Sequence, residues 1–179
     1  MAKECSTRPM AVDYIYEALI ELMRQKPYDE ITITDITKKA GVSRMAYYRN
    51  YRDKDDILIQ RFQKLMAQTK EKMVRESPKE YWAGYIERRN QDPVLEHIIR
   101  AGLFDKVFDV ALDAVKSLYQ TVYGLAMTAE HEVLLAYQKL GALYGTLLYL
   151  QDRPGQMSPD ALVDHLIELM TLDDPTGST

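Results

Sequence analysis

Cysteine is almost missing from this chain of 179 residues, which has only Cys5. A single thiol excludes an intrachain disulfide framework and a metal site built from several cysteines, and it favours a reducing compartment. The longest apolar run, Leu140 to Leu150, covers 11 residues, whereas a membrane-spanning helix needs about 20. The residues after Met1 are polar and lack the apolar centre of a secretion signal. We therefore expect a cytoplasmic protein with no membrane partner.

Motifs of catalysis and metal binding are also lacking. The sequence has no nucleophile elbow, phosphate-binding glycine loop or paired-cysteine motif. Val94, Thr128 and Leu162 stand three residues before the three histidines, so the Glu-x-x-His pattern of di-iron bundles does not occur. We expect neither an enzyme nor a bound metal or cofactor.

Charge is unevenly distributed along the chain, although the net charge is only −4. Residues 33–54 hold six basic and two acidic side chains, a local charge of +4, whereas residues 62–179 hold 12 basic and 17 acidic ones. This asymmetry indicates a basic contact segment attached to an acidic body, although an exposed basic helix face would look the same.

Helical periodicity runs through nearly the whole sequence, and no alternating strand pattern is bounded by hairpin turns. The fold class is therefore predicted to be all-α. The apolar stripes and caps predict helices at about 33–40, 44–50, 93–101, 105–123, 129–150 and 159–171, besides longer ones before residue 27, after residue 53 and after residue 77. The tail from residue 173 is predicted to be disordered.

The most informative stretch is a pair of short helices joined by a glycine turn. Thr32 and Asp35 form a capping-box pattern, Gly41 ends the first helix, and Ser43 can cap the second. This is the helix-turn-helix arrangement, whose second helix enters the major groove of DNA. The residues expected to pack the two helices together are Ile36, Ala40, Gly41 and Val42; those on the exposed start and outer face of the second helix are Ser43, Arg44, Met45, Ala46 and Arg49.

Four short motifs resemble the N-terminal domain of the tetracycline-repressor (TetR) family. They are Ile31-Thr32-Ile33-Thr34-Asp35-Ile36, Ala40-Gly41-Val42-Ser43, Tyr48-Arg49-Asn50-Tyr51 and Lys54-Asp55-Asp56-Ile57-Leu58. The resemblance covers about residues 8–62. It implies a three-helix DNA-binding domain over 1–62 and a helical effector-binding and dimerisation domain over 63–179.

The resemblance also implies roles for individual residues. Thr32, Thr34, Tyr48 and Lys54 would contact phosphates; Ser43, Arg44, Met45 and Ala46 would face the major groove; Tyr47 and Tyr51 stand where the family usually has leucine or phenylalanine, and so belong to the core. Met45 and Ala46 replace a common glycine and threonine, and so favour contact with thymine methyl groups.

Two features of the C-terminal part have an ordinary and a functional interpretation. Gly141 and Gly145 share a helix face with Tyr137 and Leu148, and small residues at this spacing suit either an internal contact or a dimer interface. The resemblance favours a homodimer in which 129–150 and 159–171 pair with their symmetry mates. An aromatic stripe suits either a plain core or an effector pocket, and the pocket candidates are Trp82, Tyr85, Phe104, Phe108, Tyr119 and Tyr123.

The resemblance and the residues together predict a homodimeric transcriptional regulator. We expect a repressor that binds a double-stranded operator and is released by a small-molecule effector. The alternative is a co-regulator of the same fold that is controlled by a protein partner instead of a small ligand.

Overall fold

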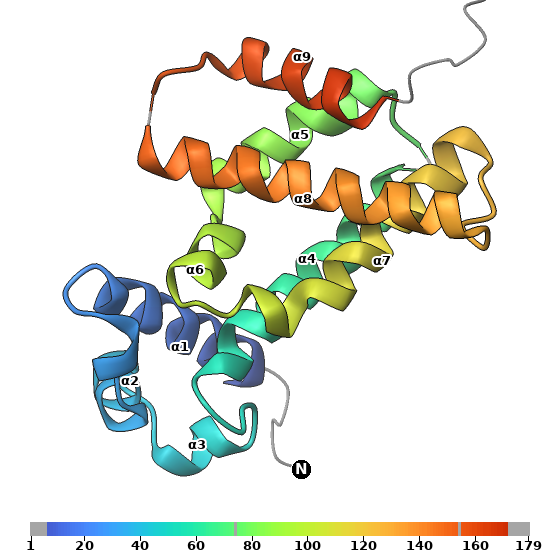
Figure 1. Ribbon diagram of the computed structural model, residues 1–179. Coiled ribbons are helices and arrows are strands. Elements are labelled where there is room, and N and C mark those ends of the chain that lie inside the picture. Colours follow the sequence, from blue (N-terminus) through green and yellow to red (C-terminus); the bar gives the residue numbers. More distant parts are fainter. Residues whose placement is uncertain (1–6, 74, 154, 172–179) are drawn as a thin grey trace, which may run out of the picture. The chain divides into compact units, whose positions relative to one another are not determined.

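The computed structural model describes residues 7–73, 75–153 and 155–171, and every regular element in them is helical, which confirms the all-α prediction (Figure 1). Cys5 and the tail from residue 173 lie outside the described residues. The elements are α1 (Thr7–Met23), the 3-10 helix η1 (Tyr28–Glu30), α2 (Ile33–Ala40), α3 (Arg44–Tyr48), α4 (Asp55–Met73), α5 (Pro78–Gln91), α6 (Val94–Arg100), α7 (Phe104–Tyr123), α8 (Glu130–Asp152) and α9 (Pro159–Met170).

The described chain divides into two compact units. The first comprises residues 7–63 and 97–107, and the second comprises residues 64–96 and 108–171. The division therefore falls inside α4, α6 and α7. Residues 97–107, which the sequence assigned to the C-terminal domain, belong with the N-terminal helices.

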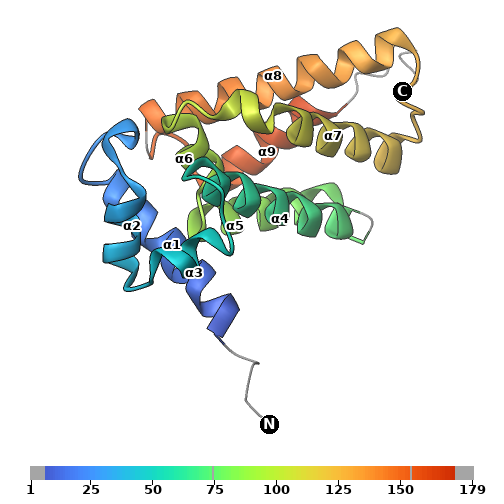
Figure 2. The same cartoon turned by 90° about the horizontal axis from the view of Figure 1, so that it is seen from below.

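In the first unit, α1 packs against both α2 and α3, and the three helices lie together in both ribbon views (Figures 1 and 2). Its core is built from side chains that are at most 2% exposed, including Ile15, Leu19, Ile36, Ile57 and Phe62. Burying such side chains stabilises a fold by about 1.5–3 kcal/mol each. This core fixes the orientation of the two short helices.

In the second unit, α9 packs against α5 and α8. Its inward face carries Leu162, Val163, Leu166 and Met170, all buried. The Lys139 ammonium of α8 donates to the backbone carbonyls of Leu169 and Thr171, at 2.6 and 3.0 Å. A cation at this place satisfies carbonyls that the end of a helix leaves without partners. α8 and α9 are therefore joined at the end of α9.

Candidate nucleic-acid interface

Local hydrogen bonds set the start and end of α2 and the start of α3. The Thr32 hydroxyl accepts from the Asp35 amide at 3.1 Å, and the Asp35 carboxylate accepts from the Thr32 amide at 3.0 Å. Gly41 ends α2 with φ = 66°, a left-handed conformation that favours glycine. The Ser43 hydroxyl then accepts from the Ala46 amide at 3.1 Å. The predicted helix–turn–helix is thus present, with caps at the predicted residues.

The side chains on the outer face of α3 are exposed to solvent. Met45 is 70% exposed and Tyr48 is 50% exposed, and Ser43, Arg44 and Arg49 are also exposed. The Arg44 guanidinium lies 3.5 Å from the Tyr48 hydroxyl, and Ala46 is half-buried. α3 ends at Tyr48, two residues before the predicted end, because the Asn50 amide donates to the Tyr47 carbonyl in a tighter turn.

Two tyrosines hold α3 from its inner side. Tyr47 is 0% exposed and Tyr51 is 4% exposed, and their rings lie 5.7 Å apart. Burial raises the pKa of Tyr51 to about 12 and that of Tyr47 further, so both stay neutral. Ile36 is fully buried, while Ala40 and Val42 are half-buried between the helices. The inner residues thus turn the polar face of α3 outward.

Lys54, for which the resemblance implied a phosphate contact, is hydrogen-bonded to backbone carbonyls of the same unit. Its ammonium donates to the carbonyls of Tyr28, Asp29 and Ile31 at 2.7, 3.3 and 3.2 Å, and it lies 4.4 Å from the centre of the Tyr28 ring. An ammonium group has three donors, and these carbonyls engage all three. We therefore assign Lys54 the role of holding η1 to the start of α4.

Some cationic side chains of the first unit form salt bridges with carboxylates, and others are exposed to solvent. Arg52 binds the Asp56 carboxylate through two nitrogens at 3.1 and 3.2 Å, and Lys39 pairs with Glu21 at 2.6 Å. Lys38, Arg44 and Arg49 are exposed, and Thr34 is exposed in the first turn of α2. These exposed groups, rather than the full local charge of +4, are the candidates for phosphate contact.

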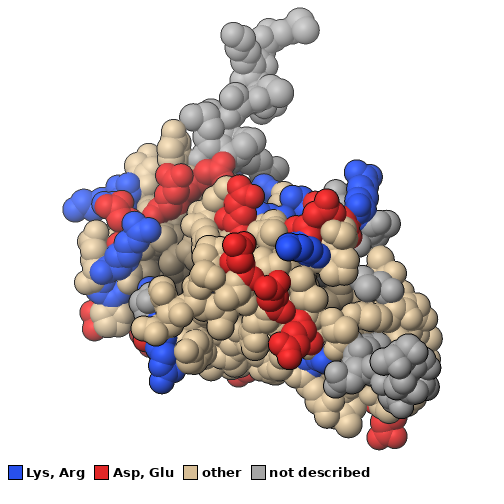
Figure 3. Space-filling view, turned by 90° about the horizontal axis from the view of Figure 1, so that it is seen from above, with Lys and Arg blue, Asp and Glu red and all other residues tan. Residues whose placement is uncertain are grey.

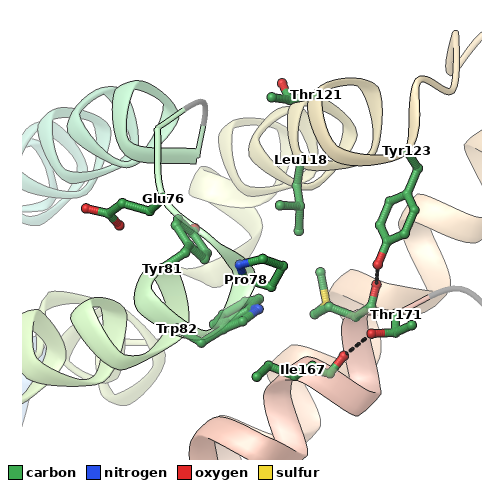
Figure 4. A pocket seen from close by; sticks show the side chains of 10 residues that line it. Glu76, Pro78, Tyr81, Trp82, Leu118, Thr121, Tyr123, Ile167 and Thr171 are labelled. Carbon is green, nitrogen blue, oxygen red and sulfur yellow. Dashed lines mark hydrogen bonds between the residues drawn. The ribbon is translucent and has the colours of Figure 1, made fainter.

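The second unit has a pocket of about 250 Å³ between α5, α7 and α9 (Figure 4). Most of its lining is aromatic or apolar, and the residues are Glu76, Pro78, Tyr81, Trp82, Leu118, Thr121, Tyr123, Ile167, Met170 and Thr171. The Tyr123 hydroxyl donates to the Met170 carbonyl at 3.5 Å, as Figure 4 shows. Trp82 and Tyr123 are the two predicted pocket residues that this lining includes.

The other four aromatic candidates lie elsewhere. Phe104 belongs to the first unit, the Phe108 ring lies 5.6 Å from that of Tyr137, and the Tyr85 ring lies 5.4 Å from that of Trp82 without joining the lining. Tyr119 is fully buried and donates to the Met170 carbonyl at 2.7 Å. Of the six candidates, Trp82 and Tyr119 are buried and Tyr123 is exposed. The helical stripe therefore showed neither which aromatic side chains are buried nor which of them surround a cavity.

α8 carries an apolar stripe on its exposed side. Leu134, Tyr137, Leu148 and Tyr149 are between 37% and 56% exposed, and a Cβ atom added at Gly141 or Gly145 would meet nothing within 4 Å. By length and composition, α8 is also apolar enough to cross a membrane, the one such helix among the described residues, although core helices of soluble proteins pass the same test. This side of α8 is therefore exposed, with open space beside its two glycines.

α9 is exposed on an acidic side. Asp160, Asp164 and Glu168 follow one another at one-turn intervals and are exposed. Figure 3 looks onto the α9 side of the second unit and shows acidic side chains in a row. No group of three or more His, Cys, Asp or Glu side chains in the described part of the chain is arranged to hold a metal ion. This side of the unit is unsuited to a polyanion such as DNA.

Solved structures with a similar fold include the following three. The fatty acid degradation regulator FadR from Bacillus halodurans has a TM-score of 0.64 at 18% identity, over 88% of this chain and 96% of that one. A Clostridium perfringens protein described as a fatty acid metabolism regulator has 0.61 at 18%, over 88% and 96%. The dihydroxyacetone kinase operon activator DhaS has 0.61 at 15%, over 89% and 93%. At these identities the likeness establishes the fold alone.

Comparison of the sequence with family models agrees with the geometry of the first unit. Residues 15–60 match the model of bacterial regulatory proteins of the tetR family, a segment that runs from α1 through the helix–turn–helix into α4. No curated protein is significantly similar to the chain. Residues 15–60 are therefore similar to the bacterial regulatory proteins of the tetR family, and this similarity covers the N-terminal helices alone.

Proposed function

We propose that the protein is a cytoplasmic transcriptional repressor that binds operator DNA through α3. The observation that carries this proposal is the exposure of one face of α3, whose residues are Arg44, Met45, Tyr48 and Arg49. Tyr47, on the opposite face, is fully buried in the core of the first unit. In a helix–turn–helix the exposed face enters the major groove. Arg44 and Met45 would contact base edges, with Ser43 and Ala46 at the start of the helix. Tyr48, Arg49 and Thr34 would contact phosphates.

Thr32 and Lys54 have a weaker case as phosphate contacts. The Thr32 hydroxyl donates to the Asp35 carboxylate as well as accepting from its amide, and Lys54 is engaged by three carbonyls. We therefore leave both out of the proposed contact set and assign them to the support of α2 and η1.

We propose that two copies bind one operator through the exposed stripe of α8. A stripe that combines Leu134, Tyr137 and Leu148 with two glycines open to solvent matches the self-complementary surface of a two-fold dimer. A dimer places two α3 helices on successive half-sites, which raises affinity over that of one short helix.

The proposed effector site is the pocket between α5, α7 and α9. Among the described residues of its lining, Glu76 is the one charged side chain, and none is a lysine or arginine that could pair with an acid group. Burial of an unpaired carboxylate or phosphate is costly, so we propose an apolar ligand without a negative charge. The chain has a single tryptophan, Trp82, so ligand entry is expected to change the tryptophan fluorescence and to release bound DNA.

Selection from a random duplex library, followed by fluorescence anisotropy at two salt concentrations, tests the proposed function. We expect an enriched palindromic site whose binding weakens steeply with salt, because phosphate neutralisation releases counterions. Arg44→Ala is expected to lose about 1–3 kcal/mol of binding free energy while keeping the oligomeric state. A library from which no site is enriched, even at low salt, would contradict the DNA-binding proposal and favour control through a protein partner.

A further inference from the structure

Residues 97–107 are distant in sequence from the helix–turn–helix but belong to the same unit. They comprise the end of α6, a corner at Gly102 with φ = 68°, and the start of α7. Ile98, Leu103 and Val107 are buried. The segment is therefore part of the packed core of the first unit rather than a connecting loop.

A salt bridge joins this segment to the first residue of α4. The Lys106 ammonium forms a salt bridge with the Asp55 carboxylate, whose other oxygen accepts from the Tyr28 hydroxyl at 2.7 Å. Burial by itself would raise the pKa of Asp55, but the hydrogen bonds from Lys106 and Tyr28 outweigh it and lower that pKa. The carboxylate therefore stays ionised between two donors from distant segments. We call Lys106, Asp55 and Tyr28 the clasp.

The clasp continues to the start of the helix–turn–helix. Tyr28 opens η1, and the carbonyls of η1 and Ile31 bind the Lys54 ammonium. Ile31 immediately precedes Thr32, the capping residue of α2. A movement of Lys106 would thus be transmitted through Asp55 and Tyr28 to the start of α2, by direct contacts at every step.

We propose that the clasp positions the helix–turn–helix for DNA binding and that Lys106 is a positioning residue outside the DNA-contacting segment. This inference rests on the proposed DNA-binding function.

The test compares Lys106→Met, Asp55→Asn, Tyr28→Phe and the double variant Lys106→Met with Asp55→Asn. Lys116→Met is the matched control, because it removes the same charge from the same helix in the second unit. Each clasp variant is expected to weaken DNA binding by roughly two- to thirtyfold, the range seen for residues that couple sites without touching ligand. Lys116→Met is expected to bind as the wild type does.

Asp55→Asn separates positioning from simple electrostatics. Removal of a negative charge from a DNA-binding unit would by itself strengthen binding to phosphates, whereas loss of the clasp weakens it. The double variant is expected to bind no more weakly than the single variants, since both changes break one interaction. The slope of affinity against salt is expected to stay unchanged, because no phosphate contact is lost.

Thermal unfolding, followed by circular dichroism, is measured for each variant to check that it folds. Lys106→Met is the variant least expected to disturb folding, because the Lys106 side chain is 53% exposed. If the wild type binds DNA and the clasp variants bind as Lys116→Met does, the inference is wrong and the proposed function stands. Tighter binding by Asp55→Asn would also overturn it. If the wild type selects no DNA site, the proposed function fails first and the inference fails with it.

Discussion

Tyr47 shows how one residue can fit its place while leaving a polar group unsatisfied. Its ring is fully buried and contacts the rings of Tyr48 and Tyr51, but its hydroxyl is buried without a hydrogen-bond partner among the described residues. Tyr47→Phe removes this desolvated hydroxyl and keeps the ring. We expect the free energy of unfolding to rise by about 1 kcal/mol, which raises Tm by roughly 2–4 °C for a chain of this size.

Thermal unfolding followed by circular dichroism measures the effect, and Tyr51→Phe is the matched control, because its hydroxyl is not among the buried groups without a partner. A lower Tm for Tyr47→Phe would mean that the hydroxyl makes a stabilising bond.

Lys54 shows what a sequence motif can and cannot predict about a single residue. Its place at the start of a helix follows from the sequence, and so does a basic side chain there. The sequence does not show that three carbonyls from residues 28–31 lie within reach of its ammonium. Tertiary contacts of this kind, and not the residue type, decide whether a lysine is available to a phosphate.

The capping box of α2 makes the stability of that element depend on pH. Hydrogen bonds from Lys26, and then from the Thr32 amide and hydroxyl, lower the pKa of Asp35 below its ordinary value. The folded state therefore binds the proton more weakly than the unfolded state does, and the contribution of Asp35 to stability is present above its unfolded pKa of about 3.9 and lost as the pH falls below it.

Asp35→Asn tests this dependence. We expect the wild type to be more stable than the variant at pH 6 and the difference to shrink toward pH 3, as measured by urea unfolding. Other acidic residues with lowered pKa values, which include Asp56 and Glu80, are present in both proteins. Their contributions therefore cancel in the difference between the two free energies of unfolding. A difference that stays constant with pH would show that the carboxylate charge contributes nothing.

Elements were predictable from the sequence where local chemistry determines them. The caps Thr32, Gly41 and Ser43 and the bounds of α2 lie as predicted, because a helix end is set by residues within one turn of it. The pocket was not predictable at the same level. Tyr119 and Tyr123 are one turn apart on α7 and both donate to the Met170 carbonyl, yet only Tyr123 lines the cavity, while Tyr119 is fully buried.

At the scale of the whole molecule, the proposed dimer depends on the two open glycines of α8. A side chain at Gly141 has room within one copy, because nothing lies within 4 Å of the added Cβ atom, and replacing glycine inside a helix favours the helix by up to about 1 kcal/mol. Gly141→Gln is therefore expected to fold normally and to sediment as a monomer, because the long side chain blocks a second helix. Gly141→Ala, which adds one methyl group, is expected to retain more dimer. A Gly141→Gln dimer as stable as that of the wild type would place the interface elsewhere.

The discontinuity of the first unit bears on how such a protein can be taken apart or recombined. A fragment cut after residue 63 would interrupt α4 and would lack Ile98, Leu103 and Val107, which complete its apolar core. A single crossover at that position between two related genes would join residues 1–63 of one protein to residues 97–107 of the other. The two parts of the first unit would then come from different proteins and would not be matched in their packing. Substitutions on the exposed surface of α3 leave the apolar core of the first unit intact, so they are the simpler way to change DNA specificity.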